Sequence, residues 1–324
     1  MRKTFADGAD RSDLSIPRSR DPNDFADYLC RAHAAGIEVD FSQGNIKLWA
    51  VALDCLMKAN LIEVASVMAP RLAQACPDVS YFRTMAALFE LLPPPCDDAS
   101  FAAFRDDVGK EVQIVRRGGA NCVILGFCGR AHALGMPVDM IHRWFGQLGA
   151  HVIYLRDYQG HNYDQGIASL SSDMSSTLRI LREQIANLGA KRIVCYGNSL
   201  GTYGALRYAL ELQAEAVLAF AGPTNLVPGF GKFAYLERNN VEPGLDLRPL
   251  YQQARYAPRV HIVYGEHHAF DRVQAANFLG LPTVTLEMAR GWSSHAVFLH
   301  TVFVGRYEPL IRWLVDPDRT AGQP

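Results

Sequence analysis

The sequence contains no long hydrophobic run and almost no net charge. Its longest apolar stretches, at 121–127 and 214–221, have the length of strands, whereas a membrane-spanning helix needs about 20 apolar residues. The formal net charge is −1, which gives no broad basic face and makes nucleic acid a poor partner. The sequence therefore predicts a globular protein with neither a membrane span nor a nucleic-acid partner.

A Cys-x-x-Cys pair and an apolar leader are also absent. The seven cysteines are scattered and odd in number, which is typical of reduced, buried thiols in a cytoplasmic protein. Residues 1–20 mix Arg, Asp and Ser without an apolar stretch, unlike a secretory signal. We expect a disordered leader over 1–20 and a cytoplasmic location.

Residues 21–95 have apolar residues at helical spacing. Four helices are expected around 25–29, 48–56, 61–68 and 81–89, and the run Pro93-Pro94-Pro95 ends the last of them. The stretch from Ile46 to Leu92 resembles a degenerate tetratricopeptide (TPR-like) hairpin, with small Ala residues where helices approach and a proline after its second helix. The segment is therefore either a helical cap or a module that binds a protein partner.

From about Glu111 the pattern changes to alternating strands and helices. Such alternation predicts a mostly parallel sheet with helices on both faces, so the fold class is α/β with a small all-helical domain in front. In the first strand we expect Val112, Ile114 and the stem of Arg116 to share one face. Gly118-Gly119 indicates a hairpin-like turn, and the pattern over 296–314 predicts one closing helix.

The α/β domain is expected to span residues 100–316. Within it, residues 225–258 interrupt the alternation with several glycines, prolines and aromatic residues. A run of this length without clear strands is typical of a lid or a binding insertion.

The candidate nucleophile is Ser199, in the run Gly197-Asn198-Ser199-Leu200-Gly201. A strand is expected before this run and a helix after it. The Gly-x-Ser-x-Gly pattern in that setting makes a sharp turn that exposes the serine and points a helix N-terminus at the reaction centre. A serine hydroxyl also needs a base, a group that orients the base, and donors for an oxyanion.

From about Glu111 to Val315 the chain resembles the α/β-hydrolase superfamily. The run Leu125-Gly126-Phe127-Cys128-Gly129 is similar to the oxyanion loop of that family, with Leu125 in place of a histidine. The resemblance implies that the backbone N–H groups of Phe127 and Leu200 bind the oxyanion. Cys128 takes the place of Phe127 if the loop register shifts by one residue.

Trp292-Ser293-Ser294-His295 follows the last expected strand and is similar to the loop that carries the catalytic histidine. His295 is therefore the candidate base, while His300, further into the helix, is expected to be a packed or surface helix residue. The family acid commonly lies where this chain has His268, so two carboxylates remain as candidates. We favour Asp271 over Glu266.

Other polar residues follow neighbouring strands at the same edge of the expected sheet, where ligands of such sheets bind. Candidate substrate contacts are Cys128, Arg130, His132, Tyr158, His161 and Tyr163. The turn at 157–161 is expected to have a structural role. The adjacent His267 and His268 should point apart with no further ligands at metal spacing, so neither a metal nor a cofactor is expected.

These residues favour a serine hydrolase that cleaves an ester or thioester through an acyl-enzyme. The acyl substrate is a small molecule or is bound to a carrier. An acyltransferase would use the same three side chains. A third hypothesis is a protein-interaction module in which the helical domain recruits an acyl-carrier protein or another protein partner.

Overall fold

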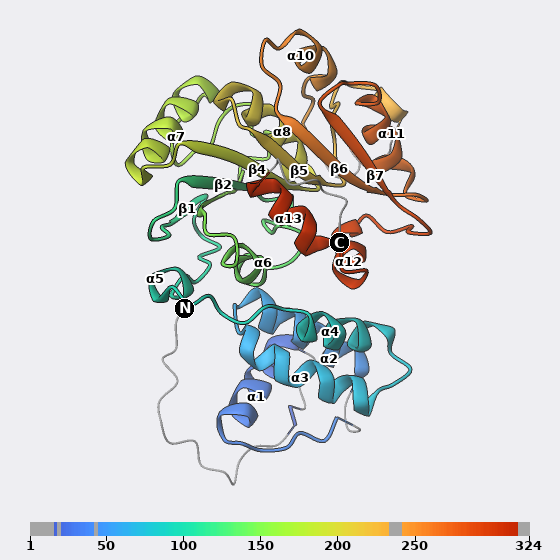
Figure 1. The fold of residues 1–324 in the computed structure, drawn as a ribbon. Coiled ribbons are helices and arrows are strands. Elements are labelled where there is room, and N and C mark those ends of the chain that lie inside the picture. The colour runs from blue at the N-terminus through green and yellow to red at the C-terminus, as the bar shows by residue number, and fades with distance from the viewer. Residues whose placement is uncertain (1–15, 18–20, 42–44, 233–241, 317–324) are drawn as a thin grey trace. The chain divides into compact units, whose positions relative to one another are not determined.

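The computed structural model describes residues 16–17, 21–41, 45–232 and 242–316 (Figure 1). The chain divides into two compact units, Met1–Leu92 and Pro93–Pro324. The predicted disordered leader, apart from residues 16–17, and part of the predicted insertion, residues 233–241, lie outside the described residues.

In the first unit, each helix packs on the next helix along the chain. They are α1 (Pro22–Ala34), α2 (Ile46–Lys58), α3 (Ile62–Ala75) and α4 (Ser80–Glu90). Trp49 is completely buried at their centre, and Phe25 and Phe41 contact it edge-on with ring centroids 4.9 and 5.2 Å away. The helices lie where the apolar spacing predicts them, while the TPR-like character of this segment stays a prediction.

The second unit is built on a seven-stranded sheet in the order β1-β3-β2-β4-β5-β6-β7. The strands are β1 (Val112–Val115), β2 (Cys122–Phe127), β3 (His151–Leu155), β4 (Arg192–Asn198), β5 (Ala216–Phe220), β6 (Arg259–Gly265) and β7 (Val284–Ala289). Only β1 is antiparallel to its neighbour, and every other adjacent pair is parallel. The prediction of a mostly parallel sheet preceded by helices is confirmed.

Helices cover both faces of this sheet (Figure 1). The helices of this unit are α5 (Ala99–Ala102), α6 (Val138–Phe145), α7 (Met174–Leu188), α8 (Leu200–Leu212), α10 (Leu247–Gln253), α11 (Ala269–Asn277), α12 (Val297–Phe303) and α13 (Tyr307–Val315), with a 3₁₀ turn at Phe230–Lys232. On one face α7 and α8 pack on alternate residues of β2, such as Val123 and Leu125. On the other face, Phe145 of α6 packs on Tyr196 of β4. Burial on both faces explains why β2 is continuously apolar.

In β1 the face that carries Val112 and Ile114 is not the buried one. Ile114 is 38% exposed, whereas Gln113 and Val115 are buried. The Gln113 side-chain oxygen accepts a hydrogen bond from the Asp107 N–H, and its amide group donates to the Asp106 carboxylate. Because β1 is an edge strand, its buried face is determined by these polar partners and not by apolar alternation.

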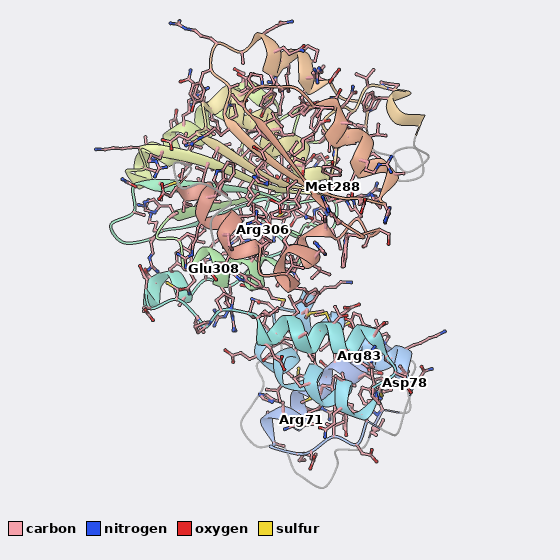
Figure 2. The ribbon with its side chains drawn as sticks, turned by 45° about the vertical axis from the view of Figure 1, so that its right-hand side comes forward. Arg71, Asp78, Arg83, Met288, Arg306 and Glu308 are labelled. Carbon is pink, nitrogen blue, oxygen red and sulfur yellow. The ribbon has the colours of Figure 1, made fainter. Side chains whose placement is uncertain are left out.

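Two connections also differ from the sequence prediction. The Gly118-Gly119 turn does not form a hairpin, because β1 pairs with β3 and not with β2, the next strand in the sequence. The closing helix is broken into α12 and α13 at Gly305, whose φ of +70° is a left-handed conformation. The side chain of Arg306, which is labelled in Figure 2, then donates to the Glu287 carboxylate on β7 at 3.0 Å.

A buried ion pair holds the loop after β2. The Arg156 side chain has no exposed surface and donates to both carboxylate oxygens of Asp106 at 2.7 Å. Its Nε donates to the His132 carbonyl oxygen at 2.9 Å. A buried guanidinium needs several acceptors to offset its desolvation, and Arg156 finds them in Asp106 and His132. Arg156 thereby links these two residues to the end of β3.

Asp139 lies beside this pair and makes stability depend on pH. Its carboxylate accepts a hydrogen bond from the Asp106 N–H, and burial raises its pKa to about 7. An acid whose pKa is raised on folding contributes stability that is full below its unfolded pKa and is lost as pH rises through about 7. Asp139→Asn should therefore gain about 1–3 kcal/mol relative to the wild type between pH 5 and pH 8.5. Urea unfolding at the two pH values measures the change, and a difference independent of pH would contradict it.

Candidate active site

Ser199 lies in the sharp turn between β4 and α8. Its φ of 54° and ψ of −128° are strained for a residue with a side chain, and its N–H donates to the Phe220 carbonyl oxygen at 2.9 Å. A Cβ on Gly197 would lie 2.6 Å from the Gly201 carbonyl oxygen, and one on Gly201 would overlap the Phe127 carbonyl oxygen. Only glycine fits at both positions, so the motif produces the turn that exposes Ser199.

His295 lies in the connection between β7 and α12 and reaches Ser199. Its Nε2 is 2.8 Å from the Ser199 Oγ, and its Nδ1 is 2.9 and 3.1 Å from the two carboxylate oxygens of Asp271. An ionised carboxylate can only accept hydrogen bonds, so Nδ1 carries the proton and Nε2 is the acceptor. The imidazole is thus oriented to receive the hydroxyl proton of Ser199.

Asp271 lies in the first turn of α11, just after β6, and its side chain has no exposed surface. It also accepts from the Gly222 N–H at 3.4 Å and lies 2.8 Å from the His268 Nδ1. The alternative acid, Glu266, instead accepts from the Gly291 N–H at 2.7 Å. Of the two carboxylates proposed from the sequence, the structure brings Asp271 to His295.

The backbone near Ser199 differs from the predicted oxyanion loop. The Cys128 N–H donates to the Leu155 carbonyl oxygen on β3 at 2.9 Å. Successive residues of a central strand direct their N–H groups to opposite neighbours, so Phe127 directs its N–H toward β4 and into the sheet. The role predicted for Phe127, or for Cys128 as its replacement, does not fit this register.

Leu200 begins α8, and the first N–H groups of a helix have no partner within it. Gly129 lies opposite: a Cβ there would be 3.1 Å from the Ser199 Cβ and 3.7 Å from the Leu200 nitrogen. The Leu200 N–H and the turn at Gly129 therefore flank the place where an oxyanion would form on a group attacked by Ser199.

A cavity of about 320 Å³ begins beside this point, lined by Gly129 and Leu200. Predicted substrate contacts that also line it are Cys128, Arg130, His132, Tyr158 and Tyr163. His161 does not line it, but its Nδ1 lies 2.5 Å from the carboxylate of Glu242, which does. The cavity is small, and its wall is about equally polar and apolar.

Two side chains that line this cavity have shifted pKa values. Burial raises the pKa of the Cys128 thiol to about 12, so it stays a neutral thiol. Burial and the nearby Arg156 guanidinium lower the pKa of His132, whose Nδ1 is buried without a hydrogen-bond partner among the described residues. At neutral pH Cys128 is therefore not a nucleophilic thiolate, and His132 carries no positive charge.

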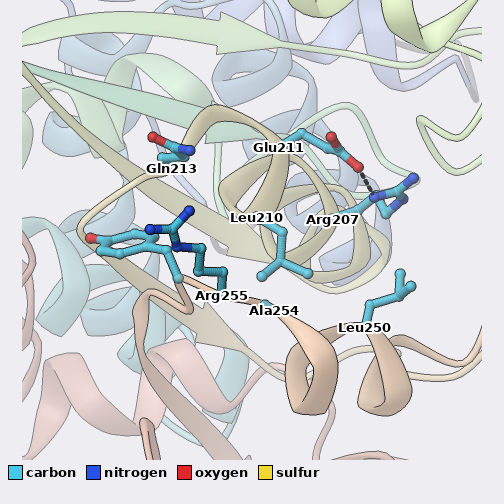
Figure 3. Close-up of a pocket in the computed structure, with 8 residues that line it drawn as sticks. Arg207, Leu210, Glu211, Gln213, Leu250, Ala254 and Arg255 are labelled. Carbon is cyan, nitrogen blue, oxygen red and sulfur yellow. Dashed lines mark hydrogen bonds and ion pairs between the residues drawn. The ribbon is translucent and has the colours of Figure 1, made fainter.

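A second cavity, of about 570 Å³, lies at the C-terminal end of α8 (Figure 3). Arg207, Leu210 and Arg255 line it, and Arg207 forms an ion pair with Glu211. A helix of this length carries that end about 15 Å or more from Ser199. This cavity contains none of the residues gathered at Ser199.

The sequence prediction that no ligand cluster accompanies His268 is wrong. One ligand atom each of His268, Asp271 and His295 lie within 4.8 Å of one another. His267, in contrast, points away and lies 3.8 Å from the Glu266 carboxylate. Among the described residues, the side chains that gather at Ser199 thus also form a possible metal-ligand set.

Comparison with known proteins shows the fold. No protein-family model and no curated protein sequence matches this chain. The structure is similar to that of the 2,6-dihydroxy-pseudo-oxynicotine hydrolase, with a TM-score of 0.51 and 18% identity over 93% of this chain and 87% of the other. The matched part of this chain is longer than the second unit, Pro93–Pro324, so the similarity extends into the helical unit.

Two further similar structures have TM-scores of 0.44. One is an S-formylglutathione hydrolase from Agrobacterium tumefaciens, 17% identical over 63% of this chain and 88% of the other. The other is an alpha/beta hydrolase enzyme from a lagoon-sediment metagenome, 15% identical over 66% and 98%. The order of the strands and the likeness to the 2,6-dihydroxy-pseudo-oxynicotine hydrolase show that the chain has the α/β-hydrolase fold. Among the described residues, no helix is both long enough and apolar enough to cross a membrane.

Proposed function

We propose that this chain is a serine hydrolase that cleaves a carboxylic ester or thioester through an acyl-enzyme. The observation that carries the proposal is the unbroken line of contacts from Ser199 through His295 to a buried Asp271, at 2.8 and 2.9 Å. Nucleophile, base and orienting acid are the three groups that acyl transfer to a serine requires. The hydrolases that share this fold are in keeping with the proposal.

In the first step His295 Nε2 takes the proton of Ser199 as Oγ attacks the carbonyl carbon. Asp271 holds Nδ1–H and stabilises the imidazolium that forms. The negative oxygen of the tetrahedral intermediate is placed at the Leu200 N–H, where the partial positive charge of the α8 N-terminus also acts. His295 then gives its proton to the leaving alcohol or thiol.

In the second step water attacks the acyl-enzyme. His295, now neutral, takes a proton from the water, and the same N–H group holds the second oxyanion. Collapse of this intermediate returns the proton to Ser199 Oγ and releases the acid. Acyl transfer to another acceptor, recruitment of a carrier or other partner by the helical unit, and a lid formed by residues 225–258 stay predictions.

A fluorophosphonate probe tests the proposal. The activated Ser199 Oγ should displace fluoride from phosphorus, so the wild type should be labelled and Ser199→Ala should not. Ser294→Ala is the matched control, because Ser294 is an exposed serine next to His295 and should label as the wild type does. A folded wild type that is not labelled would contradict the mechanism.

A further inference from the structure

His268 is a second histidine that contacts Asp271, the acid of the triad. It precedes α11, and its Nδ1 lies 2.8 Å from Asp271 Oδ2, while the His295 Nδ1 lies 2.9 Å from Oδ1 and 3.1 Å from Oδ2. The two imidazole rings lie with their centroids 5.2 Å apart. Asp271 is therefore in contact with two histidines, each through its Nδ1 atom.

Two imidazole nitrogens and one carboxylate oxygen are a ligand set that zinc accepts in proteins. Zinc bonds to nitrogen and oxygen are about 2.0–2.2 Å long, so ligand atoms around a tetrahedral ion lie a little over 3 Å apart. The two Nδ1 atoms lie 2.8 and 3.1 Å from the same oxygen, Asp271 Oδ2, and the three ligand atoms lie within 4.8 Å of one another. Rotation of the histidine side chains can therefore bring all three atoms to the spacing that the ion needs. The histidine side chains are 28% and 31% exposed, so an ion can reach them from solvent.

A triad made only of Asp271 and His295 would offer two ligands, too few for a specific site. His268 supplies the third and leaves a fourth position for water or an anion. We propose that His268, Asp271 and His295 form a binding site for a zinc ion that switches the nucleophile off. The inhibitory effect rests on the proposed function, while the binding site does not.

The inhibition follows from the tautomer of His295. When Nδ1 of a neutral imidazole binds zinc, its proton moves to Nε2, so no net proton is gained or lost by the ring. Nε2–H then faces the Ser199 Oγ, 2.8 Å away, as a donor. It can no longer accept the hydroxyl proton, and the Asp271 carboxylate is bound to the metal at the same time. Removal of the ion restores the original tautomer, so the inhibition is reversible.

Binding is measured first on Ser199→Ala, by calorimetry with zinc and by the visible absorption of bound cobalt. One equivalent should bind with the spectrum of nitrogen and oxygen ligands, in addition to any metal that is bound by thiols. Adding His268→Asn should weaken binding at least about tenfold, while His267→Asn, at the exposed neighbouring histidine, should not. The comparison is between these two variants because partly exposed thiols, such as Cys30 and Cys96, can bind zinc elsewhere. Equal affinities would overturn the site.

Inhibition is measured on chains that retain Ser199. Zinc should inhibit ester hydrolysis by the wild type and by His267→Asn, a chelator should reverse it, and His268→Asn should need at least about tenfold more zinc. Magnesium and calcium, which prefer oxygen ligands, should have no effect. Zinc binding through His268 without any hydrolysis would keep the site and reject the proposed function. Hydrolysis that is insensitive to zinc would reject the site alone.

A second measurement covers the case in which His268→Asn does not fold. Diethyl pyrocarbonate modifies accessible imidazole nitrogens, and mass spectrometry locates the modified residues. On Ser199→Ala, zinc should protect His268 and His295 and leave the exposed His267 reactive. Equal reactivity of His268 with and without zinc would overturn the proposal.

Discussion

Replacing Ser199 with alanine is expected to lower kcat/KM for an ester about 10⁶-fold, because the nucleophile and the first proton transfer are lost together. The Leu200 N–H and the cavity beside Gly129 would still bind substrate, so a small activity above the uncatalysed rate should remain. The Cβ of Ser199 is kept, so the turn and the stability of the chain should change little. Steady-state kinetics and thermal unfolding measure the two quantities.

The double variant Ser199→Ala with His295→Ala sharpens this test. When catalytic residues act as one unit, removing the first already abolishes the contribution of the second. The double variant should therefore be about as inactive as Ser199→Ala alone. If the two losses multiplied, Ser199 and His295 would act separately. Retention of more than a few per cent of wild-type activity by Ser199→Ala would contradict the proposed nucleophile.

Replacing Asp271 with asparagine should lower kcat about 10⁴-fold with a much smaller effect on KM. The carboxylate now fixes the proton on Nδ1 of His295, at 2.9 Å. An amide NH₂ group in its place would donate to Nδ1 and move the proton to Nε2, which then cannot accept from Ser199. The imidazolium of the transition state would also lose its counter-charge.

Glu266→Gln is the matched control for this variant. The Glu266 carboxylate accepts from the Gly291 N–H, whereas it is the Asp271 carboxylate that contacts the His295 Nδ1, so the loss should be less than about tenfold. A large loss in Glu266→Gln together with an active Asp271→Asn would reverse the assignment of the acid. Equal losses would show that both changes disturb the loop after β6.

The turn at Ser199 was predictable because it depends on residues next to one another. Gly197 and Gly201 are required by contacts made within the turn and with β2, and the strand and helix around them are evident in the local pattern. The position of His295 after the last strand follows from the order of elements in the fold that the motifs resemble.

The oxyanion donor was harder to predict because it depends on strand pairing. The direction of the Phe127 N–H is set by which residues of β3 and β4 lie beside it, and that register is not encoded in the residues 125–129 alone. The Leu200 N–H could be predicted as a donor without the register, because it is the first N–H of the helix that directly follows the nucleophile.

The second histidine at Asp271 could not be derived from spacing. His268 and Asp271 are three residues apart and share the start of α11, whereas His295 comes from the loop after β7. The signal that could have found the cluster was His268 itself, which occupies the usual place of the acid. A residue at that place is close to the catalytic histidine whatever its type.

The central claim is that Ser199 becomes acylated during turnover. The most direct measurement combines rapid mixing of the wild type with an activated ester and mass spectrometry of the quenched protein. The account predicts an initial burst of released alcohol equal to the enzyme concentration, provided deacylation is the slower step, and an acyl group on the peptide that contains Ser199. Turnover by the wild type with no acylated Ser199 under any quench time, and with Ser199→Ala equally active, would contradict it.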